Sequence, residues 1–165
     1  MPIVHARVDE RLIHGQVAMV WCRVTGAERI VVVNKQAVAD TMIQAALKMS
    51  KPAGMKLSIL SPEKAVINFQ DNKYGDEKIF LITKNIVDMK YLIENGVSLK
   101  KFNVGNIAAR DASIPIKKSV SLTKTDIENI NALIGEGIEI TAQMLPDEPD
   151  VTIIDYIKEA KNKEE

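Results

Sequence analysis

The 165-residue sequence has a single cysteine, no long apolar run and no recognisable secretion signal. Cys22 is its only cysteine, so no disulfide can form within the chain and no zinc site built on several cysteines is possible. No apolar run approaches the roughly 18 residues of a membrane-spanning helix, and the first residues lack the basic segment and apolar core of a secretion signal. We therefore expect a cytoplasmic protein that is neither secreted nor membrane-spanning.

The charged residues show no excess of either sign, with 22 Lys and Arg against 22 Asp and Glu. This balance gives no reason to expect binding to nucleic acid or to an anionic membrane surface. Apolar residues make up 46% of the chain and charged residues 27%, which is typical of a folded globular protein rather than a disordered one. The length predicts a single domain over residues 1–165.

Short apolar segments rich in β-branched residues alternate with segments of helical spacing. The expected strands are residues 3–8, 29–33, 56–60, 78–83, 102–104, 119–122 and 139–143. Strands separated by helices are typical of a parallel sheet covered by helices. The pattern therefore predicts an α/β fold.

Helix boundaries are indicated by apolar spacing and by capping residues. Val17, Val20, Trp21 and Val24 form one apolar stripe of a helix over about residues 15–25, so we expect Trp21 in the core. The predicted N-terminal caps of four further helices are Asp40, Ser61, Asn85 and Thr123. The last helix is expected over about residues 151–161, and the turn residues of 71–76 and 105–115 predict loops.

One of the two histidines, His14, lies between the first predicted strand and the first predicted helix. Ligands of open parallel sheets bind beyond the carboxyl ends of the strands, near helix N-termini. Arg7 at the strand end and Arg11 in the loop are close enough along the chain to converge on His14. The free N–H groups of Gly15 and Gln16 add donors at the positive end of a helix dipole. This cluster suits an anion such as phosphate.

The imidazole of His14 also has the chemistry of a phosphoryl acceptor. Its ordinary pKa of about 6.5 leaves a large neutral, nucleophilic fraction near pH 7. The guanidinium groups of Arg7 and Arg11 would offset the charge on the oxygens of the transferred group. Asp9 has two equally suitable roles, either as the partner that orients the second ring nitrogen or as a cap of the following turn.

Two other residues compete with His14 as candidates for chemistry. His5 lies within the first predicted strand, where we expect it to be an ordinary sheet residue with its hydrogen bonds satisfied. Cys22 lies inside the first predicted helix, adjacent to its apolar stripe, whereas reactive thiols need an exposed, electropositive site. We therefore expect Cys22 to be a buried or half-buried thiol.

The segment RVDERLIHGQV, residues 7–17, resembles the active-site signature of the IIB component of the mannose/fructose/sorbose class of the bacterial phosphoenolpyruvate-dependent sugar phosphotransferase system. The similarity continues in ERIVVVN, KPAGMKLSILSPEKA, KKFNVGNIA and EGIEITAQMLPDE, so it covers most of the chain. It implies a three-layer α/β/α sandwich with a mainly parallel sheet. It also implies that His14 accepts a phosphoryl group at Nδ1 from the histidine of a IIA protein. The group then passes to a sugar bound by the membrane components IIC and IID, with the protein transiently at the inner face of the membrane.

The resemblance leaves several points open. Lys35 stands where an acidic residue is expected, and Gly105-Asn106 stands where two glycines are common, which affects the expected partner or sugar specificity. Lys84, Gly105 and Asn106 also follow predicted strands, so they could line the cleft around His14, although Gly105 and Asn106 are explained equally well by a turn.

Some alternatives cannot be decided by sequence. Other classes of this transport system carry phosphate on a cysteine of the IIB protein, which makes Cys22 the competing carrier. A non-enzymatic anion-binding or regulatory module on the same fold is the alternative function, and a transferable phosphoryl group on His14 would distinguish the two. We expect no metal and no organic cofactor. The sugar, whether mannose, fructose, sorbose or N-acetylgalactosamine, and the oligomeric state are not predicted.

Overall fold

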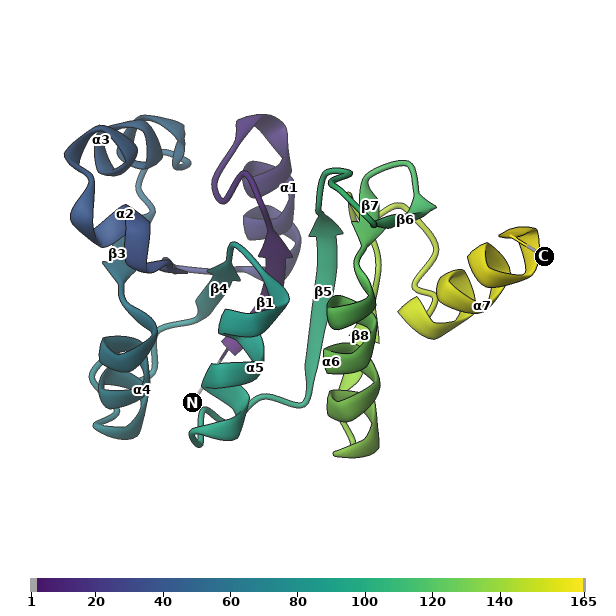
Figure 1. Ribbon diagram of the computed structural model, residues 1–165. Coiled ribbons are helices and arrows are strands. Elements are labelled where there is room, and N and C mark those ends of the chain that lie inside the picture. The colour runs from purple at the N-terminus through teal and green to yellow at the C-terminus, as the bar shows by residue number, and fades with distance from the viewer. Residues whose placement is uncertain (1–2, 165) are drawn as a thin grey trace.

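The computed structural model describes residues 3–164 and has a six-stranded sheet at its centre (Figure 1). All neighbouring strands of this sheet are parallel, in the order β3-β2-β4-β1-β5-β8. Its strands are β1 (Ile3–Asp9), β2 (Arg29–Val33), β3 (Lys56–Leu60), β4 (Ile79–Thr83), β5 (Lys101–Asn106) and β8 (Glu139–Thr141). A separate antiparallel pair consists of β6 (Ile114–Lys117) and β7 (Val120–Leu122).

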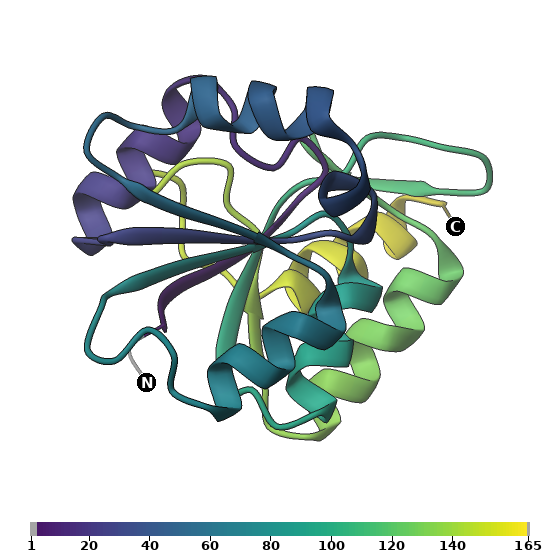
Figure 2. The same cartoon turned by 90° about the vertical axis from the view of Figure 1, so that its left-hand side faces the viewer.

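Helices cover both faces of the sheet, which gives the expected three-layer α/β/α architecture (Figure 2). On one face lie α1 (Gly15–Thr25), α2 (Lys35–Ala39) and α3 (Thr41–Ser50). On the other lie α4 (Pro62–Gln70), α5 (Ile86–Glu94), α6 (Lys124–Gly135) and α7 (Ile153–Glu164). Successive residues of a strand therefore enter opposite cores: Phe80 and Ile82 of β4 pack beneath α1, whereas Ile79 and Leu81 pack beneath α5.

The order of the strands creates a crevice at the carboxyl end of β1. The loop after β1 leads to α1 on one face of the sheet, whereas the loop after the neighbouring β4 leads to α5 on the opposite face. Connections that diverge in this way leave an opening between them, where open α/β sheets bind their ligands. The loop that carries His14 begins at this point.

The predicted helix starts are confirmed by the capping contacts. The side chain of Asp40 accepts hydrogen bonds from the N–H groups of Met42 and Ile43, and Ser61 accepts one from Lys64. The side chain of Asn85 caps α5 by accepting the N–H of Asp88. The helix α1 spans the residues predicted for it. The segment 71–76 is a series of turns, as predicted.

Four features differ from the expectation. Residues 105–115 are not one loop, because Gly105 and Asn106 belong to β5 and residues 114 and 115 belong to β6. The helix α2 was not predicted, since its five residues are too few for a periodic pattern. The segment 119–122 does form a strand, β7, but this strand pairs with β6 instead of joining the main sheet. The last helix begins two residues later than expected, at Ile153.

No helix within residues 3–164 combines the length and the apolar character needed to cross a membrane.

The capping box of α6 provides a test of the fold that is remote from the His14 loop. The hydroxyl of Thr123 accepts the N–H of Asp126 at 3.1 Å, and the carboxylate of Asp126 accepts the N–H of Thr123 at 3.0 Å. We expect Thr123→Ala to lower the free energy of unfolding by about 1 kcal/mol in urea titrations. The matched control is Thr125→Ala, because Thr125 is exposed in the first turn of the same helix. Equal stability of the two variants would contradict a capping role.

Candidate active site

The loop between β1 and α1 holds His14 in a buried position. Leu12 and Ile13, which precede it, are 7% and 3% exposed and pack in the core beneath α1 and α3. The N–H of Leu12 donates to the carbonyl of Asp9 at 2.9 Å, which closes a turn. His14 has extended backbone dihedral angles immediately before α1, and its side chain makes no capping hydrogen bond. The imidazole is therefore available for another contact.

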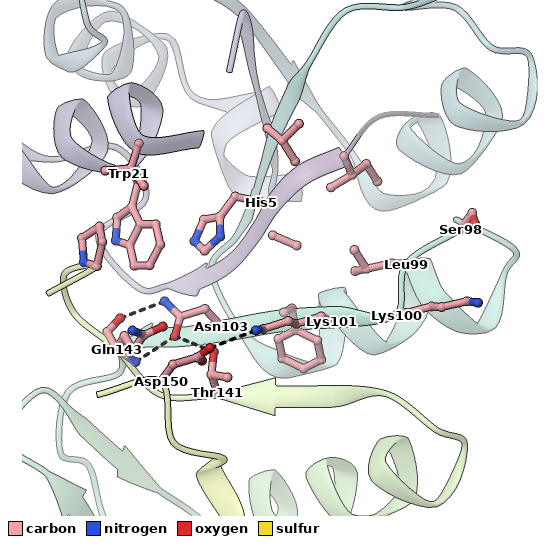
Figure 3. A pocket seen from close by; sticks show the side chains of 16 residues that line it. His5, Trp21, Ser98, Leu99, Lys100, Lys101, Asn103, Thr141, Gln143 and Asp150 are labelled. Carbon is pink, nitrogen blue, oxygen red and sulfur yellow. Dashed lines mark hydrogen bonds and ion pairs between the residues drawn. The ribbon is translucent and has the colours of Figure 1, made fainter. Parts of the chain in front are cut away.

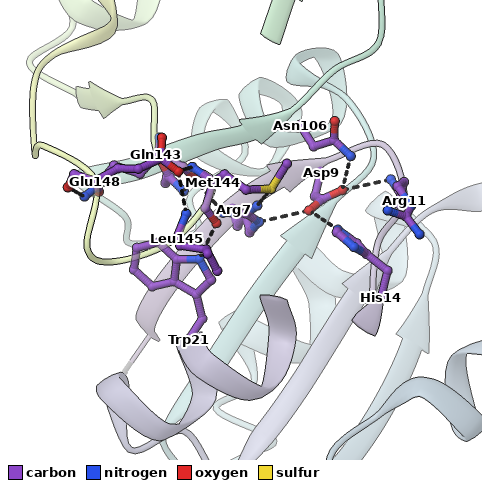
Figure 4. A network of polar contacts seen from close by, with 11 residues as sticks. Arg7, Asp9, Arg11, His14, Trp21, Asn106, Gln143, Met144, Leu145 and Glu148 are labelled. Carbon is purple, nitrogen blue, oxygen red and sulfur yellow. Dashed lines mark hydrogen bonds and ion pairs between the residues drawn. The ribbon is translucent and has the colours of Figure 1, made fainter. Parts of the chain in front are cut away.

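That contact is with Asp9, the last residue of β1, which is completely buried (Figure 4). Oδ2 of Asp9 lies 2.7 Å from Nε2 of His14. Oδ1 accepts the backbone N–H of Arg11 at 2.9 Å and lies 3.4 Å from Nδ2 of Asn106. Asp9 thus takes both roles that the sequence left open, because one oxygen contacts the ring and the other supports the turn.

Electrostatics keeps the carboxyl group of Asp9 ionised. Burial by itself would raise the pKa of Asp9, but the hydrogen bond with His14 and the charge of Arg7 outweigh burial and lower the pKa below its usual value. An ionised carboxylate only accepts hydrogen bonds, so the hydrogen between the two side chains must be on Nε2 of His14. In the neutral ring the lone pair is then on Nδ1.

Arg7 does not lie at the surface, where the sequence analysis expected it to contact a phosphate. Its side chain is 1% exposed, and Nε donates to Oδ2 of Asp9 at 3.0 Å. Nη1 donates to the carbonyl of Gln143 at 2.9 Å, and Nη2 lies 3.4 Å from the sulfur of Met144. Burial lowers the pKa of Arg7 while the neighbouring Asp9 opposes that shift. Arg7 therefore forms a hydrogen bond with Asp9 in the protein interior, shielded from solvent.

The other expected phosphate-binding residues lie on the exposed side of the loop. Arg11, Gly15 and Gln16 are all exposed, and Gly15 has φ +46°, a backbone conformation that favours glycine. Arg11 and Asn106 line a cleft of about 590 Å³. The remaining residues that line it are Lys117, Lys118, Ser119, Met144 and Glu148. These five were missed by the sequence analysis, because nothing in their local sequence indicates proximity to residues 9–14.

Lys35 and Lys84, the two lysines named from the sequence, follow other strands of the sheet than β1. Lys35 is exposed after β2, and Lys84 after β4 donates to Oε1 of Gln36 at 3.4 Å. Within residues 3–164, no hydrogen bond or ion pair joins either lysine to the His14 loop. Over the same part of the chain, no three His, Cys, Asp or Glu side chains form a group able to hold a metal ion.

A second cleft, of about 550 Å³, has His5 and Trp21 on its wall and contains none of the residues of the His14 loop (Figure 3). The rings of His5 and Trp21 stack with centroids 4.0 Å apart, and Phe80 meets His5 edge-on. The expectation that His5 is satisfied by hydrogen bonds is wrong, because its buried Nε2 has no hydrogen-bond partner among the described residues. Burial, followed by the charges of Arg7 and Lys101, lowers the pKa of His5 to about 3.

Cys22 is buried in α1, as expected, and burial raises the pKa of its thiol to about 11. The thiol therefore stays protonated near neutral pH, which is unfavourable for a nucleophile.

A histidine paired with a buried carboxylate at the carboxyl edge of a parallel sheet, beside a cleft lined by Arg11, Lys117 and Lys118, is an arrangement suited to a small anion. The comparison with protein families identifies the class of protein. The family of the PTS system sorbose subfamily IIB component matches residues 3–165, and the chain belongs to this family. IIB components of the phosphotransferase system are phosphotransferases of sugar uptake, and the family implies partners of the IIA and IIC/IID types.

Individual relatives agree with this assignment. The sorbose-specific EIIB component of Klebsiella pneumoniae is 35% identical over 159 residues, which are 96% of this chain and 97% of the relative. The mannose-specific EIIAB component of Escherichia coli (strain K12) is 34% identical over 157 residues, 95% of this chain but 49% of the longer relative. The crystal structure of the IIBSor domain of the Klebsiella pneumoniae sorbose permease superposes with a TM-score of 0.92 at 35% identity, covering 96% of this chain and 98% of that one.

The unusual environment of His5 predicts a pH-dependent stability. The pKa is about 3 in the folded protein and about 6.5 in the unfolded chain, so below pH 6.5 the unfolded chain binds a proton that the folded protein excludes. The stability is complete above pH 6.5 and falls by about 1.4 kcal/mol per pH unit toward pH 3. His5→Phe keeps a ring against Trp21 but cannot titrate. As the pH is lowered from 7 to about 5, the wild type loses stability through His5 and the variant does not. We therefore expect the unfolding free energy of His5→Phe to rise by about 2 kcal/mol relative to that of the wild type over this range.

Urea titrations at the two pH values provide the measurement. Cys22→Ala is the control, since a thiol with a pKa of about 11 does not titrate in this range. If the difference in unfolding free energy between the wild type and His5→Phe does not change with pH, His5 is not held neutral in the folded protein.

Proposed function

We propose that His14 is the phosphoryl carrier of this IIB protein, accepting the group from a histidine of a IIA protein and passing it to a sugar. The observation that carries the proposal is the 2.7 Å contact between Nε2 of His14 and the buried carboxylate of Asp9. This contact fixes the tautomer in which Nδ1 is nucleophilic. The same tautomer supports Nδ1 as the atom that is phosphorylated, and Asp9 as the residue that orients the ring.

The transfer is balanced without a further reactant. The lone pair of Nδ1 forms a bond to phosphorus while the bond from phosphorus to the donor imidazole breaks, and that imidazole leaves with the electron pair. The hydrogen on Nε2 remains shared with Asp9, so positive charge that develops on the ring of His14 faces a carboxylate. In the second transfer the oxygen of a sugar hydroxyl attacks the phosphorus, the bond to Nδ1 breaks with its electron pair returning to Nδ1, and the hydroxyl proton passes to solvent.

Arg11 is the residue best placed to hold the oxygens of the phosphoryl group. It is exposed, its backbone is held by Asp9, and it lines the cleft beside His14. The N–H groups at Gly15 and Gln16 would add donors at the start of α1. Arg7 acts indirectly through Asp9, because its guanidinium is enclosed. Lys117 already pairs with Glu148 at 2.6 Å, so its charge is partly neutralised.

The small exposure of His14, whose side chain is 9% accessible, favours a partner that docks over the loop rather than a freely diffusing donor. The IIA protein and then the membrane components IIC and IID would occupy this surface in turn, with the IIB protein in the cytoplasm. Relatives named for sorbose and for mannose are 35% and 34% identical to this chain, which favours neither sugar. We propose that the membrane components bind the sugar and that the IIB protein distinguishes protein surfaces.

His14→Gln tests the carrier role directly. Incubation with phosphoenolpyruvate and the upstream phosphotransferase proteins should label the wild type at His14 and leave His14→Gln unlabelled, because the amide cannot form the phosphoramidate. Mass spectrometry locates the added group, and phosphorus NMR of the denatured protein distinguishes Nδ1 from Nε2. The label should be lost in acid and kept in alkali, since protonation makes imidazole a good leaving group.

His5→Gln and Cys22→Ala are the controls and should be labelled at the wild-type rate. Wild-type labelling of His14→Gln, or an acid-stable label on the peptide that contains Cys22, would refute the proposal. A phosphoryl group at Nε2 would refute only the orientation of the ring. A protein that is never labelled but binds inorganic phosphate would be the non-enzymatic anion-binding module.

Arg11→Lys tests whether the planar guanidinium is needed. Lysine keeps the charge but loses the fork that engages two oxygens at once, so we expect transfer to slow by about tenfold, which corresponds to the loss of about 1.4 kcal/mol. The measurement is the single-turnover labelling rate with limiting donor. Arg23→Lys is the matched control, because Arg23 lies exposed at the far end of α1. Equal rates for Arg11→Lys and the wild type would remove Arg11 from the phosphate site.

A further inference from the structure

We infer that Gly105 and the segment from Gln143 to Glu148 form a seat for the guanidinium of Arg7, and that this seat positions Asp9 against His14. The seat has a floor, a far wall and an opening toward Asp9. None of these residues forms a hydrogen bond with the imidazole, whose partner is Asp9, so we assign all of them a positioning role. Only the expected effect on the rate of phosphoryl transfer rests on the proposed function.

The floor of the seat is the backbone of Gly105 in β5. A Cβ atom at this position would lie 2.0 Å from Cζ of Arg7 and 2.2 and 2.3 Å from its two terminal nitrogens. Carbon and nitrogen atoms do not approach this closely without a bond, so the guanidinium can occupy its place only if residue 105 has no side chain. Glycine is therefore required here by packing.

The backbone conformation does not explain this glycine. Six glycines have a positive φ, namely Gly15, Gly26, Gly54, Gly75, Gly96 and Gly137, and Gly105 is not among them. Gly105 is the additional residue of an irregularity in the pairing of β1 with β5, where Val8 faces Val104 but Asp9 faces Asn106. This irregularity places Asn106 beside the carboxylate of Asp9 and leaves the backbone of Gly105 beneath Arg7.

The far wall of the seat is held by several elements. The side chain of Asn103 donates to the carbonyl of Gln143 and accepts its N–H, each at 2.8 Å. The indole of Trp21 donates to the carbonyl of Met144 at 3.0 Å. The carboxylate of Glu148 accepts the N–H groups of Met144 and Leu145, which closes the segment into a turn. The carbonyl of Gln143 is thereby fixed where Nη1 of Arg7 meets it.

The opening of the seat directs Nε of Arg7 at the same oxygen of Asp9 that contacts His14. Without the guanidinium, the completely buried carboxylate would lose the one ion pair with an arginine or lysine that it forms within residues 3–164. A buried carboxylate without a partner charge binds a proton readily, and a protonated carboxyl can donate to Nε2. The ring would then carry its hydrogen on Nδ1, which is the wrong tautomer for phosphorylation at Nδ1.

The test is a double-mutant cycle with Gly105→Ala and Arg7→Ala, read by the labelling rate, by urea unfolding and by nitrogen NMR of the histidine ring. Gly105→Ala alone should reduce the labelling rate by about tenfold or more and shift the His14 tautomer toward Nδ1–H. In the Arg7→Ala background, the same substitution should change the rate and the tautomer by less than about twofold, because the atoms that clash are gone. Gly135→Ala is the matched control, since nothing lies within 4 Å of a Cβ there.

An equal effect of Gly105→Ala in both backgrounds would overturn the inference, as would a wild-type tautomer in Gly105→Ala. If Gly105→Ala alone does not fold, a folded Arg7→Ala/Gly105→Ala protein supports the seat, and a double variant that also fails to fold contradicts it. The NMR measurement needs no phosphoryl donor. It therefore decides on the seat even if His14 proves never to be phosphorylated, in which case the proposed function alone fails.

Discussion

The buried negative charge of Asp9 is the constraint on which this end of the molecule depends. Transferring a carboxylate from water into a protein interior costs several kcal/mol unless charges and hydrogen bonds compensate it. Here the compensation comes from the guanidinium of Arg7, the ring of His14 and the N–H of Arg11, with Asn106 nearby. These groups belong to one strand, the following loop and the neighbouring strand. The contacts that compensate the charge of Asp9 therefore connect β1, the following loop and β5.

The topology of the sheet explains why such a charge can be used chemically. β1 is a central strand whose backbone pairs with β4 on one side and β5 on the other, and the loop beyond its carboxyl end reaches the crevice between diverging connections. Asp9 is the last residue of β1, and His14 is the last residue before α1. A rigid, dry support thus lies directly behind a ring that has limited exposure. This is the arrangement in which a preorganised carboxylate has its largest effect on a nearby charge.

The site has a local part, formed by residues close together in the sequence, and a distant part that reaches residues 143 and 144. The alternation of strands and helices, the caps at Asp40, Ser61, Asn85 and Thr123, and the cluster of residues 7–16 were predictable, because each depends on neighbours within a few positions. The contacts of Arg7 with residues 143 and 144 were not, since they span more than 130 positions and involve a backbone carbonyl. The buried side chain of Arg7 followed no local rule, as arginine is usually exposed.

One signal for the distant part was present in the sequence. A single glycine within an apolar strand indicates a bulge or a close approach of another group, and Gly105 in FNVGN fits that description. It was equally compatible with a turn, and the strand that ends at Asn106 is what separates the two interpretations. The strand β6 was also hard to predict from its own residues. Pro115 and the lysines at 117 and 118 interrupt the apolar pattern of a strand, and β6 forms through its pairing with β7.

The two histidines show how environment rather than residue type determines chemistry. His5 and Arg7 are two positions apart on β1, yet Arg7 directs its charge toward Asp9 and His14 while His5 is enclosed by Trp21 and Phe80. Among the described residues His5 has no carboxylate partner, and with a pKa of about 3 its ring lacks a group that would stabilise positive charge on it. His14 has the buried carboxylate that His5 lacks. Arg7 thus contributes to the surroundings of His14, the proposed carrier, through Asp9, whereas the surroundings of His5 are aromatic.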